Sequence, residues 1–251
     1  MTGKPLRLYP LPPWEVSAIY EDLELPPAGR RDASRPYVII NMVSSLDGKV
    51  AIEGKASRLG SETDRQTMRT LRSKADAVMI GAGTLRAERL SLGLDDPAGP
   101  QPLAVIATTS GNVPLESNLI AGERQEVLVV APEDVTVRFS ERRPRVLRVS
   151  KDLSSNIDLA ETLKVLRTEY TVDLLLVEGG PKLSHSLISQ NLADELFLTL
   201  APKLLGGIPG EGPTILSGNV LVAGDIHLLS AYLVGDELFL RYGLHPFHLD
   251  D

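Results

Sequence analysis

The segment that most constrains the fold is residues 173–177 (Asp-Leu-Leu-Leu-Val), in which an unbroken apolar run follows Asp173 and leads into Glu178-Gly179-Gly180-Pro181. A strand that is apolar throughout is typical of a parallel sheet covered on both faces by helices. Proline at the first position of a helix wastes no backbone donor, and paired glycines reach backbone angles closed to other residues. The segment therefore predicts a buried central strand followed by a helix that begins at Pro181.

Short apolar runs alternate with helical periodicity along the rest of the chain, which is typical of an α/β fold. We expect strands near 37–44, 76–81, 102–108, 126–131, 145–149, 173–178, 194–200, 226–233 and 237–242. Helices are expected over 62–74, with Ser61 as N-cap, and over 157–169 and 181–190. Only Gly235-Asp236 separates the last two strands, which predicts an antiparallel hairpin. The fold class is thus α/β, with three layers and a mostly parallel, mixed sheet.

The proline-rich N-terminus is expected to differ from the remainder. Residues 1–36 contain Pro12-Pro13 and Pro26-Pro27, and proline removes a backbone donor that a sheet needs. We therefore expect an arm over 1–36 rather than a sheet strand. The absence of an internal repeat or a low-complexity linker predicts one domain over 37–251.

Composition excludes several classes of function. The chain has no cysteine, which rules out disulfides, thiolate nucleophiles and the His/Cys/Cys zinc site of nucleobase deaminases. A net charge of −7 argues against nucleic acid as a partner. No apolar run is long enough to cross a membrane and no secretory signal is evident, so a cytoplasmic location is expected. No metal is expected, because the four histidines lack ligand spacing: His185, His227, His245 and His248.

Two glycine-containing junctions are candidate anion sites. A helix that begins at Pro181, after Gly179-Gly180, would direct free N–H groups at an anion such as a pyrophosphate. A tight turn without a ligand explains the same spacing equally well. The second junction is Gly81-Ala82-Gly83-Thr84, where the threonine could cap a helix or a phosphate, but Arg86 stands at the last glycine position of a Rossmann fingerprint. A dinucleotide is long enough to touch both strand ends.

A third junction follows the apolar strand that begins at Val38. It reads Ser44-Ser45-Leu46-Asp47-Gly48-Lys49 and is small, polar and flexible. Lys49 could place a cation beside a substrate carbonyl or phosphate, and Asp47 could orient the substrate. Both residues could equally serve as ordinary turn residues.

Taken together, these junctions resemble the riboflavin-biosynthesis pyrimidine reductase family, the reductase domain of a bifunctional deaminase-reductase with a dihydrofolate-reductase-like fold. The resemblance spans residues 36–243 and rests on four ordered motifs: NMVSSLDGKVA, ADAVMIGAGT, LLLVEGGPKL and ADELFLTLAPKLLGG. It implies an NADPH-dependent oxidoreductase that reduces the ribosyl unit of a phosphoribosylaminopyrimidine to a ribityl chain. The cofactor supplies the chemistry in such enzymes, so few catalytic side chains are expected. No deaminase activity is expected.

The resemblance also assigns residues to the cofactor. Val43 and Ser44 would contact the nicotinamide, Thr84 the phosphates, and Thr108-Thr109-Ser110 the adenosine ribose with its 2′-phosphate. The segment from Gly180 to Ser186 would hold the pyrophosphate. The full set of expected cofactor contacts is Val43, Ser44, Gly81, Gly83, Thr84, Glu88, Thr108, Thr109, Ser110, Gly179, Gly180, Pro181, Lys182 and Leu183.

Substrate contacts carried over from the family are Lys49, Ser57, Arg72, Leu92 and Glu178, with Lys49, Glu178 and Asp47 as the catalytic candidates. A carboxylate at Glu178 could accept hydrogen bonds from pyrimidine amino groups, and Arg72 would suit the phosphate. The chain departs from the family at Asp95, where many members have a phosphate-binding arginine. Arg86 or Arg89 could supply that charge instead.

Two other functions remain open at this stage. Asp95 and its altered loop are compatible with a related reductase acting on a pterin or dihydrofolate-like compound. A paralogue that binds dinucleotide without catalysis is the third possibility. A homodimer through the C-terminal strands is expected, because the family dimerises there and the hairpin 226–242 has an edge that would otherwise need protection.

Overall fold

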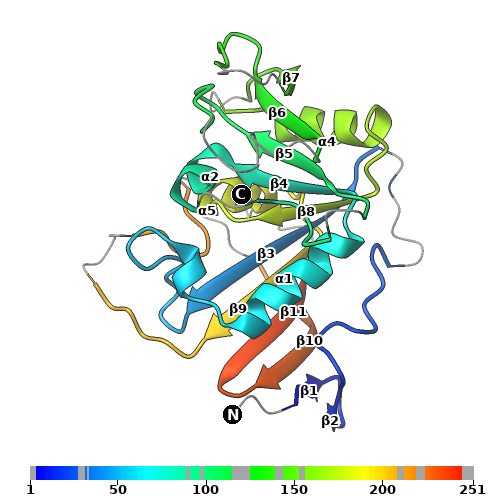
Figure 1. The fold of residues 1–251 in the computed structure, drawn as a ribbon, viewed down its shortest axis with the longest axis vertical. Coiled ribbons are helices and arrows are strands. Elements are labelled where there is room, and N and C mark those ends of the chain that lie inside the picture. Colours follow the sequence, from blue (N-terminus) through cyan, green and yellow to red (C-terminus); the bar gives the residue numbers. More distant parts are fainter. Residues whose placement is uncertain are drawn as a thin grey trace. The chain divides into compact units, whose positions relative to one another are not determined.

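The computed structural model describes residues 4–27, 32, 34–88, 91–96, 99–114, 125–138, 144–152, 156–207, 212–218 and 224–244 (Figure 1). The chain forms two compact units. The first contains Met1–Glu24, Ile39–Thr70 and Pro181–Asp251, and the second contains Leu25–Val38 and Leu71–Gly180.

The second unit holds five parallel strands in the order β8-β4-β5-β6-β7. Their bounds are β4 Ala77–Gly81, β5 Leu103–Ala107, β6 Val127–Pro132, β7 Arg145–Val149 and β8 Leu174–Glu178, and the helices are α2 Ala82–Glu88 and α4 Leu159–Thr168. All five residues of β8 are buried, as the unbroken apolar run predicts. Asp158 caps α4 by accepting a 2.9 Å hydrogen bond from the backbone N–H of Glu161.

The first unit is largely antiparallel. Its strands are ordered β2-β1-β10-β11-β9-β3, and only β3 and β9 run parallel. The bounds are β1 Leu6–Tyr9, β2 Trp14–Glu15, β3 Tyr37–Ser45, β9 Glu195–Ala201, β10 Ile226–Val234 and β11 Glu237–Leu244, with η1 Ala56–Arg58 and α5 Pro181–Ser189. The α/β class, with a mixed and mostly parallel sheet and an antiparallel C-terminal hairpin, is confirmed.

All nine predicted strands and all three predicted helices are present, with bounds that agree to within two residues. Sequence reasoning missed β1, β2, η1 and α2. Because α2 begins at Ala82, Thr84 is the third residue of that helix rather than its N-cap, and a phosphate contact of Thr84 stays a prediction. The glycine turn predicted after β4 is instead the first turn of this short helix.

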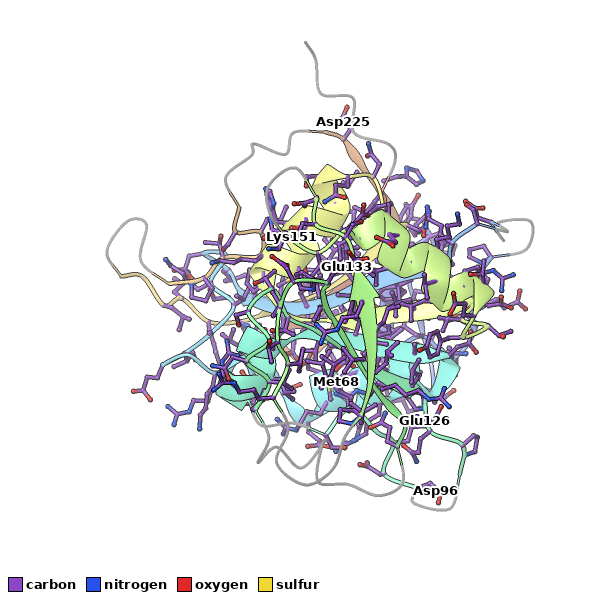
Figure 2. All side chains as sticks on the ribbon, turned by 90° about the horizontal axis from the view of Figure 1, so that it is seen from above. Met68, Asp96, Glu126, Glu133, Lys151 and Asp225 are labelled. Atoms are coloured by element: carbon purple, nitrogen blue, oxygen red, sulfur yellow. The ribbon has the colours of Figure 1, made fainter. Side chains whose placement is uncertain are left out.

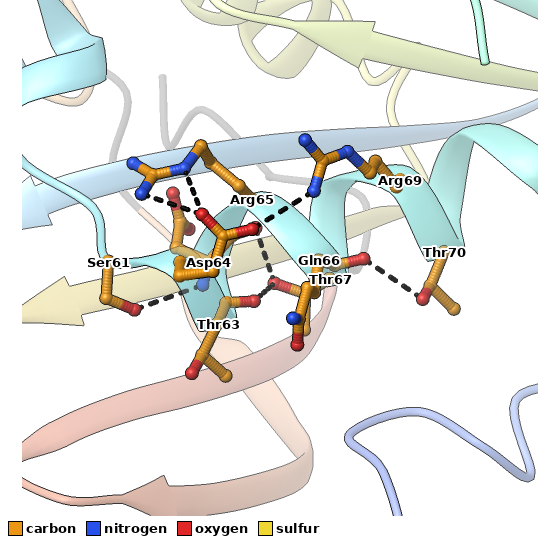
Figure 3. A network of polar contacts seen from close by, with 9 residues as sticks. Ser61, Thr63, Asp64, Arg65, Gln66, Thr67, Arg69 and Thr70 are labelled. Carbon is orange, nitrogen blue, oxygen red and sulfur yellow. Dashed lines mark hydrogen bonds and ion pairs between the residues drawn. The ribbon is translucent and has the colours of Figure 1, made fainter. Parts of the chain in front are cut away.

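The N-terminus of α1 (Glu62–Lys74) follows the sequence prediction. Ser61 Oγ accepts a 3.2 Å hydrogen bond from the N–H of Asp64, which confirms the N-cap (Figure 3). Arg65 and Arg69 donate to the carboxylate of Glu62, at 2.9 and 3.2 Å. An acidic residue in the first turn also suits the helix dipole, so local sequence is sufficient to specify where this helix begins.

The expectation of an arm without sheet strands over residues 1–36 is wrong. Leu6–Tyr9 pairs antiparallel with β10, and Tyr20 packs edge-on against Phe197 and Tyr232, with ring centroids 5.1 and 5.3 Å apart. Val16, Ile19, Tyr20 and Leu23 are buried. The prolines lie beyond the ends of this short strand, where no ladder donor is lost.

Part of the hairpin edge behind the predicted dimer is covered within the chain. β9 pairs with β11, and β1 pairs with β10 at Ala231, Tyr232 and Leu233. β1 does not extend along Ile226–Ser230, so the edge argument for a dimer is restricted to this part of β10. A homodimer remains a prediction, and so does the single domain over 37–251.

Candidate functional site

The carboxyl ends of three neighbouring strands lie at one edge of the second unit. β8, β4 and β5 are parallel, with Val177 beside Met79 and Gly81 beside Ala107. The turns after these strands and the short helix α2 hold most of the predicted cofactor residues: Gly81, Gly83, Thr84, Glu88, Thr108, Thr109, Ser110, Gly179 and Gly180. Ligands of open α/β sheets bind outside this edge, so the strand ends form a candidate dinucleotide site.

The two glycines after β8 are required by geometry. Gly179 and Gly180 have φ angles of +72° and +92°, a region that side chains rarely adopt. A Cβ atom on Gly179 would also lie 3.3 Å from Cγ2 of Thr84. The backbone after β8 therefore passes close to α2 and leaves its peptide groups uncovered by a side chain of its own.

The turn after β5 presents hydroxyl groups. Thr108 is buried and its N–H donates to the carbonyl of Val130 at 2.9 Å, whereas Thr109 and Ser110 are exposed. Arg86 Nη1 donates to the carbonyl of Asn112 at 2.5 Å, which brings a guanidinium to the same turn. Hydroxyls and a guanidinium are suitable donors for a phosphate.

The end of the next strand, β6, carries charges of both signs. Glu133 is exposed directly after β6 (Figure 2), and Lys151 donates to Asp134 at 2.5 Å. This hydrogen bond lowers the pKa of Asp134. The cationic charge of Lys151 is thus balanced locally, whereas Arg86 donates directly to the turn after β5.

A buried ion pair joins α1 to the last residue of β8. Arg72 Nε and Nη2 donate to Oε1 and Oε2 of Glu178, both at 2.6 Å, and the two side chains are 5% and 8% exposed. Arg72 Nη1 donates to the carbonyls of Ser91 and Gly93, at 2.9 and 3.2 Å. All three guanidinium nitrogens are therefore engaged, which competes with the predicted phosphate contact of Arg72.

The end of α2 and the loop after it contain three further residues for which the sequence predicted a role. Glu88 is half-buried at the end of α2, Leu92 is fully buried, and Asp95 is exposed. Arg89, predicted as a possible substitute for the family arginine, lies outside the described residues. Because Arg72 holds the carbonyls on either side of Leu92, this loop is fixed from inside the unit.

In the first unit, the turn after β3 contains Asp47 and Lys49. Asp47 accepts hydrogen bonds from Ser45 Oγ at 2.6 Å and from the N–H groups of Leu205 and Gly206, at 3.1 and 2.7 Å. These three bonds lower its pKa to about 2. Asp47 is therefore ionised and occupied by its own turn and a neighbouring segment, as the turn interpretation expects.

Lys49 is anchored through its backbone. Its N–H donates to Ser45 Oγ at 3.0 Å, its carbonyl accepts from the N–H of Ser45 at 2.9 Å, and an isolated bridge pairs it with Thr214. Ser57 lies exposed in η1. The structure thus places Asp47, Lys49 and Ser57 in the first unit, and Arg72, Leu92 and Glu178 in the second.

Two buried hydroxyls in the first unit are candidate ligand contacts. Within the described part of the chain, Ser44 Oγ on β3 and Ser184 Oγ in the first turn of α5 have no hydrogen-bond partner, although both residues are fully buried. An unsatisfied buried hydroxyl is costly and is explained when a ligand supplies the partner. Near them, Val43, Pro181 and Leu183 are half-buried and Lys182 is exposed. This observation fits a bound cofactor at β3 and α5.

Sequence reasoning missed two features of these surroundings. The first is the pairing of Arg72 with Glu178, which are 106 positions apart and which no local signal connects. The second is the segment Lys203–Gly206, whose backbone groups hold the turn of Asp47. Its signal was the motif APKLLGG, to which no role was assigned.

The described residues show neither a metal site nor a membrane-spanning helix. Among them, no cluster of acidic and histidine side chains has the arrangement of a metal site. No helix in this part of the chain is long and apolar enough to cross a bilayer. His245 and His248 lie outside the described residues.

These features define an α/β protein of the dihydrofolate-reductase-like type with glycine and hydroxyl groups at its strand ends. RibD of Acinetobacter baumannii has the same fold, with a TM-score of 0.68 at 23% identity over 84% of this chain and 58% of that longer chain. The chain belongs to the RibD C-terminal domain family, whose sequence pattern matches residues 36–237.

Two relatives in that family resemble the chain over most of their own length. A protein of Archaeoglobus fulgidus is 33% identical over 199 residues, which are 74% of this chain and 88% of the relative. One of Methanothermobacter thermautotrophicus is 29% identical over 217 residues, 83% of this chain and 98% of the relative. Both are named 2,5-diamino-6-ribosylamino-4(3H)-pyrimidinone 5′-phosphate reductase.

Proposed function

We propose that this chain reduces the ribosyl group of 2,5-diamino-6-ribosylamino-4(3H)-pyrimidinone 5′-phosphate to a ribityl chain, with NADPH as reductant. The names of the two relatives support this substrate. The observation that carries the proposal is the buried Arg72–Glu178 pair directly before Gly179-Gly180. It puts an oriented carboxylate beside the backbone turn that is proposed to receive the cofactor.

Glu178 is proposed to recognise the pyrimidine. A carboxylate has about four lone-pair sites, and the two N–H groups of Arg72 use one on each oxygen. The remaining sites can accept hydrogen bonds from the amino groups of a diaminopyrimidine. Arg72 thereby orients Glu178, and its own contact with the substrate phosphate is not part of the proposal.

The residues at the strand ends fit a nicotinamide dinucleotide. The hydroxyls of Thr109 and Ser110 and the guanidinium of Arg86 are proposed to hold the 2′-phosphate, which gives the preference for NADPH over NADH. The buried hydroxyls of Ser44 and Ser184, in the first unit, are proposed to gain their missing partners from a bound ligand. The cofactor supplies a hydride to the anomeric carbon of the substrate. The protein contributes position and the exclusion of water.

Lys49 and Asp47 have different proposed tasks. The Lys49 ammonium, on an anchored backbone, is proposed to bind the substrate phosphate or a ring carbonyl. Asp47, with a pKa of about 2 and three hydrogen bonds, is ionised at neutral pH and holds no proton to donate. Its role is therefore to hold the turn, and the earlier prediction that it is catalytic is not retained in the proposal.

The decisive experiment supplies the purified chain with NADPH and the diaminopyrimidine ribosyl phosphate. Loss of NADPH absorbance, matched mole for mole by ribityl product, is the expected result, with a much lower kcat/KM for NADH. Turnover of dihydrofolate, but not of the ribosyl compound, would favour the pterin-type reductase. Tight NADPH binding without any turnover would favour the non-catalytic paralogue.

A homodimer and a cytoplasmic location are also proposed, on the resemblance alone. Light scattering after size exclusion at micromolar concentration is expected to give twice the 27.2 kDa of one chain. A monomer under those conditions would contradict the dimer.

A further inference from the structure

The segment Lys203–Gly206, which follows β9, holds the turn that carries Lys49. The N–H groups of Leu205 and Gly206 donate to the two oxygens of Asp47, at 3.1 and 2.7 Å. On the same turn, the N–H of Leu46 donates to the carbonyl of Lys203 at 2.9 Å. Three backbone groups of one segment thus bind a turn that lies about 160 residues earlier in the sequence.

The same segment also holds the short helix that carries Ser57. Lys203 Nζ donates to the carbonyl of Arg58 at 3.1 Å and to that of Leu59. These carbonyls lie at the C-terminal end of η1, where a cation is favourable because such groups lack partners within the helix. A single lysine therefore joins the end of β9 to η1.

We propose that Lys203–Gly206 is a positioning segment that sets Lys49 and Ser57 together for the substrate, with Asp47 and Lys203 as its two positioning residues. The inference rests on the proposed function, in which Lys49 and Ser57 contact the substrate. It assigns a role to the APKLLGG motif. Asp47 then holds the turn that carries Lys49 and takes no part in the chemistry.

The path from the segment to Lys49 is short and consists of hydrogen bonds. Asp47 binds Ser45 Oγ at 2.6 Å, and Ser45 in turn binds both the N–H and the carbonyl of Lys49. A shift of the segment would therefore move the base of the Lys49 side chain. Small displacements of a positioning group reduce catalytic efficiency strongly, because the reacting groups lose alignment.

Three variants test the proposal: Asp47→Asn, Lys203→Met and the double variant. Asparagine keeps the size of Asp47 but presents an NH2 group to backbone donors, and methionine keeps the stem of Lys203 without its donors. Each single variant is expected to raise the KM for the pyrimidine substrate about 10-fold, with the dissociation constant for NADPH unchanged. Two independent effects would multiply to about 100-fold, and the double variant is expected to raise KM by much less, because both residues act through one segment.

Controls separate positioning from general loss of stability. Lys203→Arg keeps a charged donor and is expected to restore most of the affinity. Asp22→Asn, which removes an exposed carboxylate that accepts a hydrogen bond from Arg7, and Lys164→Met, at an exposed position on α4, are expected to leave KM unchanged. The thermal midpoint of each variant is measured alongside.

Amide hydrogen exchange provides a reading that does not need activity. Asp47→Asn is expected to speed exchange at Leu59, whose N–H bonds Ala56 in η1, and Lys203→Met is expected to speed it at Lys49. The proposal that one segment positions both residues is refuted by either of two results. One is that each variant speeds hydrogen exchange only at its own contact, and the other is that the rise in KM of the double variant equals the product of the two single rises. If the parent protein turns over no pyrimidine, the proposed function fails. The effect of each variant on hydrogen exchange at the other residue's contact still tests the positioning segment in that case.

Discussion

Two ion pairs of this protein have the same chemistry and different surroundings. In the second unit, Arg72 binds Glu178 through Nε and Nη2, both at 2.6 Å. In the first unit, Arg241 binds Glu195 through the same nitrogens, at 2.6 and 2.7 Å. Both carboxylates are almost fully buried, and both pairs have the forked geometry that makes such contacts strong.

Their positions differ. Arg241 and Glu195 project from the adjacent strands β11 and β9, and the guanidinium lies 5.6 Å from the ring centre of Phe197. Glu178 is instead the last residue of β8, and the next two residues have positive φ angles. The Arg241–Glu195 pair is enclosed by the side chains of a sheet, whereas the Arg72–Glu178 pair lies beside backbone that no side chain covers. A buried pair thus indicates a site only where its surroundings leave room for a ligand.

The largest expected effect separates the two carboxylates. Glu178→Gln leaves the buried Arg72 without its charge partner and is expected to lower the free energy of unfolding by about 3–5 kcal/mol in urea titrations. Glu195→Gln does the same to Arg241, which is only half-buried, and is expected to lower it by less. Only Glu178→Gln is expected to lower kcat/KM for the pyrimidine, by about 100-fold or more, since a carboxamide presents donors to the amino groups of the substrate.

Equal losses of activity in the two variants would show that Glu178 acts through stability alone. Activity is therefore measured at a temperature where both variants remain folded by circular dichroism. A replacement of both partners by apolar residues, Arg241→Met with Glu195→Leu, is expected to recover stability, because the desolvation cost of both charges disappears.

A smaller effect tests the fork itself. Arg72→Lys and Arg241→Lys keep the charge but lose the two parallel hydrogen bonds, so each is expected to cost about 2 kcal/mol of unfolding free energy. Arg72→Lys also releases the carbonyls of Ser91 and Gly93. It should raise the KM for the pyrimidine several-fold, while Arg241→Lys leaves it unchanged; the reverse order would contradict an orienting role for Arg72.

The smallest effect concerns Asp47, an exposed carboxylate that contrasts with both buried ones. Its pKa is lowered from the model-peptide value of 3.8 to about 2, so its bonds stabilise the fold above pH 4 and lose this contribution as the pH falls towards 2. The difference in unfolding free energy between the parent and Asp47→Asn is expected to be constant from pH 5 to 8 and to shrink below pH 4. A difference that changes near neutral pH would contradict the lowered pKa.

The pH dependence of catalysis gives a matching control. Because Asp47 stays ionised above pH 4, the acidic limb of the kcat/KM profile is expected to lie at the same pH in the parent and in Asp47→Asn. A limb that disappears in the variant would restore a proton-transfer role to Asp47.

Local sequence determined most of the elements of this protein. Three features each predict their element from neighbouring residues, and all three elements are present: the apolar run 174–177, Ser61 before an acidic first turn, and Gly235-Asp236 between two strands. Hydrophobic periodicity and capping act over a few residues, so they can be read without knowledge of the fold. The ordered glycine and polar motifs likewise indicated the family.

Tertiary structure decided what the side chains contact. Glu178 and Arg72 were assigned separately to the pyrimidine and the phosphate, but they bind each other across 106 positions. The N-terminal prolines predicted an arm, yet Leu6–Tyr9, which lies between two of them, pairs with β10 as a strand. The sequence left Asp47 open between orienting the substrate and holding its turn, and the N–H groups that Leu205 and Gly206 donate to its oxygens favour the turn. A hydrogen bond between distant segments depends on how the chain returns to itself, and no local pattern in the sequence encodes that geometry.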